Sequence, residues 1–306
     1  MKKLTLSVLV LMSLALTSLP ALASIEGSFE RTVDVSGRAT LEIYTRSGDV
    51  SVKSGSSGSI SISGKIWVND HWWSSGSHRV DVSDVEKNPP IQQNGNMVRI
   101  DYPSSHDISI NFEISVPPDT TVRTHTGSGD QRMEGLKGTV DLESGSGDLQ
   151  LRDLRGGVRL HSGSGDVEAR NMAGAFTAET GSGDIDCEQN GAGDVEVHTG
   201  SGNIEIHTMQ GALHAEAGSG DLSIDGKQAG PWEVRTGSGN VELRLPSDSA
   251  FDLDATTSSG SLTVDHPVTM TVQGDVERSR HSVKGHVRGG GSPLTVHTSS
   301  GDIRIY

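Results

Sequence analysis

The sequence contains little cysteine and few aromatic residues. Because Cys187 is its one cysteine, an intramolecular disulfide is excluded, and the fold must be held by other interactions. Aromatic residues make up 4% of the 306 residues, whereas glycine occurs 39 times. Such a chain cannot fill a wide globular core with large side chains, but it can fill a narrow core with Val, Ile and Leu.

Long apolar stretches are also missing, except for one at residues 4–16 that follows two lysines. Together with the small-residue site Ala21-Leu22-Ala23, this stretch predicts a signal peptide of residues 1–23, cleaved near Ala23. An uncleaved membrane anchor is the alternative, but the stretch is short for a membrane span. We therefore expect an extracytoplasmic mature chain, periplasmic or secreted, without stable membrane insertion.

Positive charge is scarce. The chain has 25 Lys and Arg against 40 Asp and Glu, a net charge of −15. Removal of the signal peptide takes away two lysines and no acidic residue, which changes the net charge to −17. An acidic surface of this size repels nucleic acids and anionic lipid headgroups, so we expect no nucleic-acid partner.

The chain does contain a repeat. A motif of Gly-Ser-Gly, preceded by a small residue and followed by Asp or Asn, recurs in steps of 18 or 19 residues. A fixed period of this kind is typical of units that stack on one another. Degenerate copies end at Ser261 and Asp302, and an early copy ends at Asp49. The regular copies end at Asp130, Asp148, Asp166, Asp184, Asn203, Asp221 and Asn240.

Between these motifs apolar and polar residues alternate, which predicts strands with one inward apolar face. We therefore predict an all-β fold, a parallel β-helix or β-solenoid with regular coils of about 18 residues over 124–306. Residues 24–123 are predicted to form an irregular β-rich N-terminal cap with an insertion at 69–96. The 41 residues between the motifs ending at 261 and 302 fit two longer coils. Cys187 takes an inward position, as a small core residue.

The Asp and Asn residues that end the motifs have two interpretations. Calcium binding, by analogy with nonapeptide β-rolls, would favour anionic ligands. Hydrogen bonding in the turns accepts either side chain, and Asn203 and Asn240 replace Asp without any other change. We therefore predict that these residues are structural, and we predict neither a metal site nor a cofactor.

A column of outward residues alternates between base and acid from repeat to repeat. Charge pairing between neighbouring strands is the simpler explanation, and a His/Glu metal site is the alternative. The column consists of His125, Glu143, His161, Glu179, His198, Glu216 and Arg235.

Three of the four tryptophans, Trp67, Trp72 and Trp73, lie close together in the irregular N-terminal region. Exposed aromatic rings can stack on sugars or anchor a protein partner, which makes these residues candidate ligand-binding residues. The alternative is that they cover the open end of the core.

The recurrent SGD and SGN turns, each followed by an alternating apolar strand, resemble those of the putative-adhesin family of exported bacterial β-strand-repeat proteins, a domain of unknown function. The strand before Pro117 and the closing segment ending in TSSGDIRI are similar to that family as well. The resemblance implies a β-solenoid outside the cytoplasm and supplies no catalytic residues.

Two classes of function therefore stand. We predict a non-enzymatic adhesin or cell-envelope binding or scaffold protein, whose partner is an envelope glycan or a protein. A polysaccharide lyase or hydrolase on a parallel β-helix is the alternative, and it would need a break in the repeat that gathers acids and a base. The irregular segment 266–291 is the late candidate for such a break.

Overall fold

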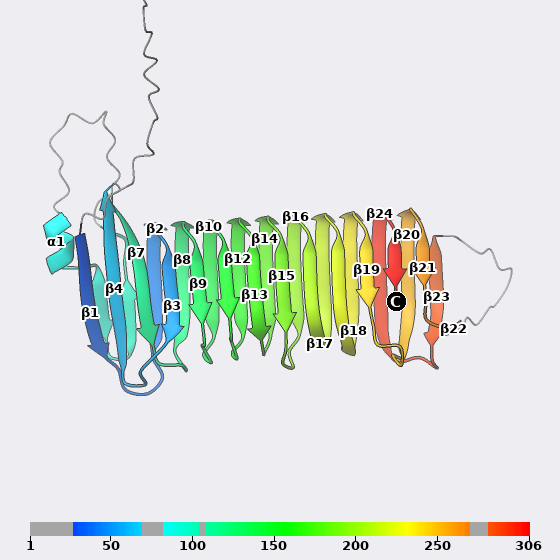
Figure 1. The fold of residues 1–306 in the computed structure, drawn as a ribbon, viewed down its shortest axis with the longest axis horizontal. Helices are drawn as coiled ribbons and strands as arrows, with labels where there is room; N and C mark the ends of the chain where they lie inside the picture. The colour runs from blue at the N-terminus through cyan, green and yellow to red at the C-terminus, as the bar shows by residue number, and fades with distance from the viewer. Residues whose placement is uncertain (1–26, 69–81, 104–107, 270–280) are drawn as a thin grey trace, which may run out of the picture.

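The computed structural model describes residues 27–68, 82–103, 108–269 and 281–306. Apart from one short helix, α1 (Val82–Lys87), the regular elements in these residues are β-strands, so the predicted all-β class is confirmed. The strands form a long stack, which Figure 1 shows from the side. None of the helical structure in the described residues has the length and apolar character needed to cross a membrane.

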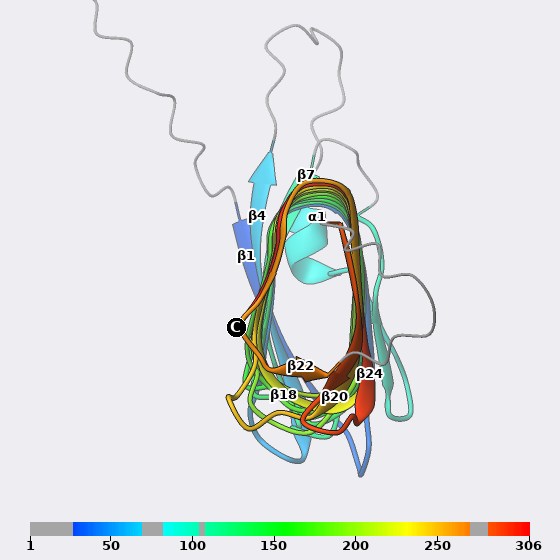
Figure 2. The ribbon, with the colours of Figure 1, turned by 90° about the vertical axis from the view of Figure 1, so that its right-hand side faces the viewer.

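The middle of the stack is built from one long and one short strand per repeat, joined at the Gly-Ser-Gly motif. Equivalent strands pair in parallel, so that Val140 lies between Val122 and Val158. Seen along the stack, the repeats superimpose on a narrow, flattened ring (Figure 2). The long strands are β8 (Thr121–Ser128), β10 (Val140–Ser146), β12 (Val158–Ser164), β14 (Phe176–Ser182) and β16 (Val195–Ser201), and the short ones are β9 (Gln131–Glu134), β11 (Leu149–Arg152), β13 (Val167–Met172) and β15 (Ile185–Gln189). β17 (Ile204–Ser219) and β18 (Leu222–Ser238) each combine a short and a long segment, and β19 (Val241–Arg244) follows.

The core is a continuous column of inward side chains. Leu142, Leu160 and Ala178 occupy equivalent positions on successive long strands, and all three are buried. The first residue of each motif is buried too, and in most motifs its hydroxyl donates to a nearby backbone carbonyl, as Ser144 does to Ser146 at 3.2 Å. The exceptions are Ala217, which has no hydroxyl, and Thr126 and Thr180, whose hydroxyls have no partner among the described residues. A buried hydroxyl thus takes part in most of these turns, together with the glycines and the Asp or Asn.

At the N-terminal end the chain does not stack in sequence order. β2 (Thr40–Ser47) lies between β6 (Met97–Ile100) and β8, and β3 (Val50–Ser54) lies between β7 (Ile108–Val116) and β9. The antiparallel strands β4 (Ser59–Val68) and β1 (Gly27–Asp34) follow β7 and end the parallel pairing. β5 (Ile91–Asn94) forms a hairpin with β6. The predicted boundary between residues 123 and 124 falls inside β8.

The C-terminal end corrects one expectation, because the described residues between the last two motifs do not stack as two longer coils. β20 (Phe251–Ser259) and β21 (Leu262–Val264) lie at the end of the parallel stack, and β24 (Ser292–Ser300) and β25 (Ile303–Ile305) are inserted between them and β18–β19. Figure 1 shows these last strands, in red, inside the stack. β23 (Ser282–Val287) pairs antiparallel with β20 and β22 (Val268–Thr269), which covers the last parallel edge.

Candidate binding surface

Of the three tryptophans predicted to bind a ligand, only Trp67 lies in the described part of the chain. It lies in β4 opposite Ser109 of β7 and is half-buried. Its indole Nε1 is buried and has no hydrogen-bond partner among the described residues. Trp72 and Trp73 lie outside the described residues, so their role in binding stays a prediction.

A second group of aromatic side chains lies at the same end of the stack. We call Tyr44, Tyr102, Arg46 and Arg99 the N-terminal aromatic cluster. The two tyrosine rings meet edge to face with centroids 6.1 Å apart. The Arg99 guanidinium lies 4.3 Å from the centre of the Tyr44 ring, and that of Arg46 lies 4.9 Å from the centre of the Tyr102 ring. Alternating rings and cations of this kind fix one another's orientation.

The backbone and neighbouring acids hold the cluster in place. Arg99 Nε donates to Asp101 Oδ1 at 2.8 Å, and this bond holds the pKa of Arg99 above its ordinary value. Arg46 donates to the carbonyl of Pro103 at 3.3 Å. Tyr102 remains 37% exposed. Its ring therefore faces solvent while Arg46 and Tyr44 hold it in place. No local pattern in the sequence predicts this cluster, because it depends on β6 lying beside β2.

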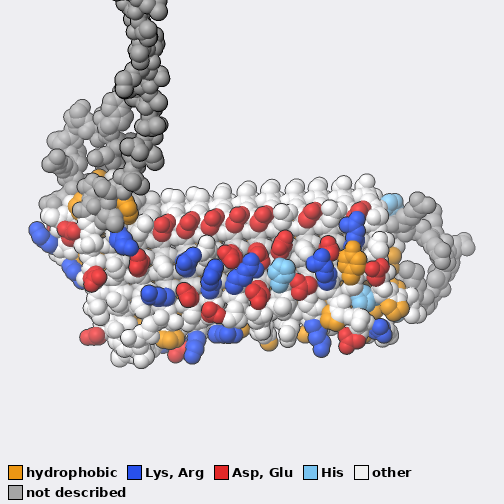
Figure 3. Space-filling view, in the orientation of Figure 1, with side chains coloured by type: hydrophobic (Ala, Val, Ile, Leu, Met, Phe, Trp, Pro, Cys, Tyr) orange, Lys and Arg blue, Asp and Glu red, His pale blue; other side chains and the backbone are white. Residues whose placement is uncertain are grey.

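The predicted turn residues form a ladder along one edge of the stack. In each step the side-chain Oδ1 of one Asp or Asn accepts a hydrogen bond from the backbone N–H of the equivalent residue in the next layer. Asp148 Oδ1 accepts from Asp166 N at 3.0 Å, and Asp166 Oδ1 accepts from Asp184 N at 2.9 Å. The row of acidic side chains along the upper edge in Figure 3 follows this ladder. The bonds therefore link neighbouring layers, whereas the prediction from the sequence was a bond within each turn.

The ladder includes both asparagines and continues to the ends of the stack. Asn203 Oδ1 accepts from Asp221 N at 3.0 Å, as an aspartate would. At the far end Asp302 Oδ1 accepts from the backbone N–H of Ser261 at 2.8 Å, and this bond holds the pKa of the Asp302 carboxyl below its ordinary value. Each Asp or Asn of the ladder thus contributes the same group, a side-chain oxygen that accepts a hydrogen bond.

We expect Asp148→Asn to leave the free energy of unfolding almost unchanged, because the amide oxygen can accept the same bond. Asp148→Ala removes the acceptor and should cost on the order of 1 kcal/mol. Thermal melts with and without calcium measure both effects. A calcium-dependent rise in melting temperature that Asp148→Asn abolishes would instead assign these side chains to calcium.

The outward His/Glu column lies where the repeat register places it, with His161 between Glu143 and Glu179. Nitrogen–oxygen distances are 2.8 Å for His125–Glu143, 3.4 Å for His161–Glu179 and 4.0 Å for His198–Glu216. These side chains are about half exposed, so each pair contributes little to stability.

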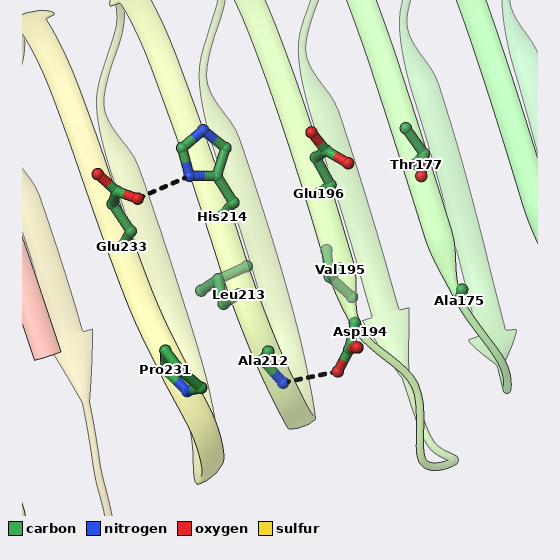
Figure 4. Close-up of a pocket in the computed structure, with 10 residues that line it drawn as sticks. All are labelled: Ala175, Thr177, Asp194, Val195, Glu196, Ala212, Leu213, His214, Pro231 and Glu233. Carbon is green, nitrogen blue, oxygen red and sulfur yellow. Dashed lines mark hydrogen bonds and ion pairs between the residues drawn. The ribbon is translucent and has the colours of Figure 1, made fainter. Parts of the chain in front are cut away.

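Figure 4 shows a shallow hollow on the face of the long strands, where small residues lie between longer ones. Its polar groups already engage one another. His214 Nδ1 lies 3.3 Å from Glu233 Oε2, and Asp194 Oδ1 accepts from the backbone N–H of Ala212 at 3.0 Å. This arrangement can line a surface contact.

Cys187 is fully buried in the core, as predicted. Burial raises the pKa of its thiol to about 12. A thiol of this kind is almost entirely protonated at neutral pH, so it packs as a small apolar residue and does not act as a nucleophile.

The sequence profile of a family described as Toastrack DUF4097 matches residues 30–171 and 155–306 of this chain. The chain belongs to the Toastrack family. This assignment confirms the family resemblance seen in the SGD turns. No curated protein matches the sequence significantly.

Two crystal structures are similar to this Toastrack chain. A putative cell adhesion protein from Clostridium sporogenes shares 10% identity over 91% of this chain and 99% of its own, with a TM-score of 0.22. A putative adhesin from Bacteroides fragilis shares 12% identity over 92% of this chain and 98% of its own, with a TM-score of 0.33.

Proposed function

We propose that this chain is an exported, non-enzymatic β-solenoid with coils of about 18 residues that binds a cell-envelope glycan in the manner of an adhesin. The observation that carries the proposal is the N-terminal aromatic cluster, in which the exposed Tyr102 and the half-buried Tyr44 are held between two arginines. Flat aromatic rings cover the apolar faces of sugar rings, and the guanidinium N–H groups beside them can donate to sugar hydroxyls.

The contrast between the middle and the end of the stack supports this location. The middle layers repeat the same outward positions, and their acids and bases pair with one another. Of the three large hydrophobic side chains exposed in the described part of the chain, Met97 and Tyr102 flank Arg99 at the N-terminal end, and Tyr306 is the third. The N-terminal end therefore offers a ligand exposed apolar side chains that the middle layers lack among the described residues. The predicted sites Trp67, Trp72 and Trp73 belong to the same region of the sequence.

Export is supported by the apolar segment and the small-residue site at Ala21-Leu22-Ala23. The net charge of −17 expected for the mature chain keeps it soluble and away from anionic surfaces. The stack then acts as a stiff support that presents its end to the envelope.

A glycan array followed by calorimetry on residues 24–306 tests the proposal. We expect Tyr44→Ala/Tyr102→Ala to weaken binding of the array's best ligand at least ~10-fold, since stacking on an aromatic ring contributes on the order of 1–3 kcal/mol. The control is Tyr306→Ala, which removes an exposed tyrosine at the other end of the chain and should bind like the parent.

Equal binding by the double tyrosine variant and the parent would place recognition elsewhere. The variant Trp72→Ala/Trp73→Ala then examines the remaining candidates, with an unchanged melting temperature as the condition for assigning a loss to binding. Release of cleaved sugar products during the same assay would support the polysaccharide lyase or hydrolase instead.

A further inference from the structure

The face formed by the short strands carries interleaved acidic and basic side chains (Figure 3). In the earlier layers arginine supplies the positive charge, and Arg170 pairs with both Glu168 and Asp186. Further along this face, His207 lies beside Asp186 and Glu205. Histidine differs from arginine because neutral imidazole offers a lone pair to a metal.

Three donor atoms converge at this point. His207 Nε2 lies 3.8 Å from Glu205 Oε2 and 4.0 Å from Asp186 Oδ1. Among the described residues, this is the one group of three metal-ligating side chains whose donor atoms all lie within 4.8 Å of one another. Glu205 and His207 come from β17, and Asp186 lies opposite Glu205 in β15, so regular strand backbone fixes all three.

A fourth residue orients the imidazole. His207 Nδ1 lies 2.6 Å from Asp225 Oδ1, and Asp225 Oδ2 accepts a hydrogen bond from the backbone N–H of Thr208 at 3.1 Å. With the Nδ1 proton donated to this anchored carboxylate, the lone pair of neutral His207 is on Nε2, which faces the two other carboxylates. A carboxylate on the far ring nitrogen is the arrangement that usually supports a metal-bound histidine.

The spacing of the donors suits a small transition-metal ion. Bonds of about 2.0–2.2 Å at tetrahedral angles put ligand atoms about 3.4 Å apart. The two separations from His207 Nε2, 3.8 and 4.0 Å, therefore need to close by only about half an ångström. Asp186 also pairs with Arg170, but each carboxylate oxygen has two lone pairs and can serve a metal and a guanidinium together. The imidazole nitrogen favours zinc-like ions over calcium or magnesium, which prefer oxygen.

We propose that Asp186, Glu205 and His207 form a binding site for a divalent transition-metal ion such as Zn²⁺, with Asp225 as the residue that positions His207. A water molecule completes the fourth coordination position and leaves it open to exchange. The site lies on the regular stack, far along the sequence from the N-terminal aromatic cluster, and is independent of it.

Calorimetric titration of the tag-free mature chain with ZnCl₂ tests the site. We expect one saturable site per chain, lost or weakened at least ~100-fold in His207→Gln and weakened about 10–100-fold in Asp225→Asn. The matched control is His161→Gln, which removes a histidine that pairs with Glu179 in the outward column and should bind zinc like the parent. Circular dichroism verifies that every variant retains the strand-rich fold.

Two results would overturn the assignment. Zinc binding of equal strength in His207→Gln would locate the metal at other ligands. Absence of saturable binding in the parent would show that these side chains form no zinc site. Nitrogen-15 NMR gives an independent check, because zinc should shift the resonance of His207 Nε2 more strongly than that of Nδ1.

Discussion

Replacing Gly165 by alanine should lower the free energy of unfolding by about 3–5 kcal/mol, because two costs act together. The residue has φ = +130°, a region that L-residues rarely adopt and that costs on the order of 1–3 kcal/mol. A Cβ atom there would also lie 2.1 Å from the carbonyl oxygen of Gly147 in the preceding layer. The layers would have to separate, and overpacking of this kind costs a further 1–3 kcal/mol or so.

Three other glycines separate these two costs. Gly163→Ala tests close approach alone, since its added Cβ would lie 2.6 Å from the Gly145 carbonyl oxygen. Gly37→Ala tests backbone conformation alone, since φ is +82° and the added Cβ would meet open space. Gly58→Ala has neither problem and should be neutral or slightly stabilising. Urea unfolding followed by circular dichroism ranks the four variants, and a Gly165→Ala midpoint equal to that of Gly58→Ala would contradict the close approach of the layers.

Trp232→Ala should be about as damaging, with a loss of about 3–5 kcal/mol. The side chain is 1% exposed and lies between Leu213 and Leu294 on the neighbouring strands. Its Nε1 donates to the Gly211 carbonyl at 2.9 Å, so the substitution removes both packing and a hydrogen bond. The remaining core is narrow and has few large side chains with which to fill the cavity.

Trp232→Phe provides the control. It keeps most of the ring volume and loses the hydrogen bond, so we expect a cost of about 1–2 kcal/mol. Urea unfolding monitored at a far-ultraviolet wavelength avoids dependence on the tryptophan signal. Equal destabilisation by Phe and Ala would show that the hydrogen bond, and not the packing, dominates at this position.

The regular part of the fold was predictable because each repeat contains, within about 18 residues, the features that set its strand register and its inward face. The step from Asp148 to Asp166 sets the pairing register, and the alternation around Leu149 and Leu151 sets the inward face. The inward position of Cys187 followed from the same alternation.

The order of the strands at both ends was not predictable. The motifs ending at Ser261 and Asp302 have nearly the same sequence. Neither motif therefore predicts which of the two layers lies closer to the middle of the stack. The insertion of β24 between β18 and β20 is decided by long-range pairing and by the antiparallel strand β23. The N-terminal aromatic cluster has the same origin, because Tyr44 and Tyr102 meet only where β6 returns to β2. The contact of Asp186 with His207 instead joins neighbouring layers of the regular stack and follows from the repeat register.

The inserted C-terminal strands also determine when the protein can finish folding. In a simple repeat array each new unit docks on the previous one as the chain emerges, and loss of the last unit leaves the others intact. Here β20 and β21 are synthesised before β24 and β25 but contact the rest of the parallel stack through them. Residues 292–306 therefore complete the parallel stack: until they are synthesised, β20 and β21 lack the parallel partners that they have in the folded protein.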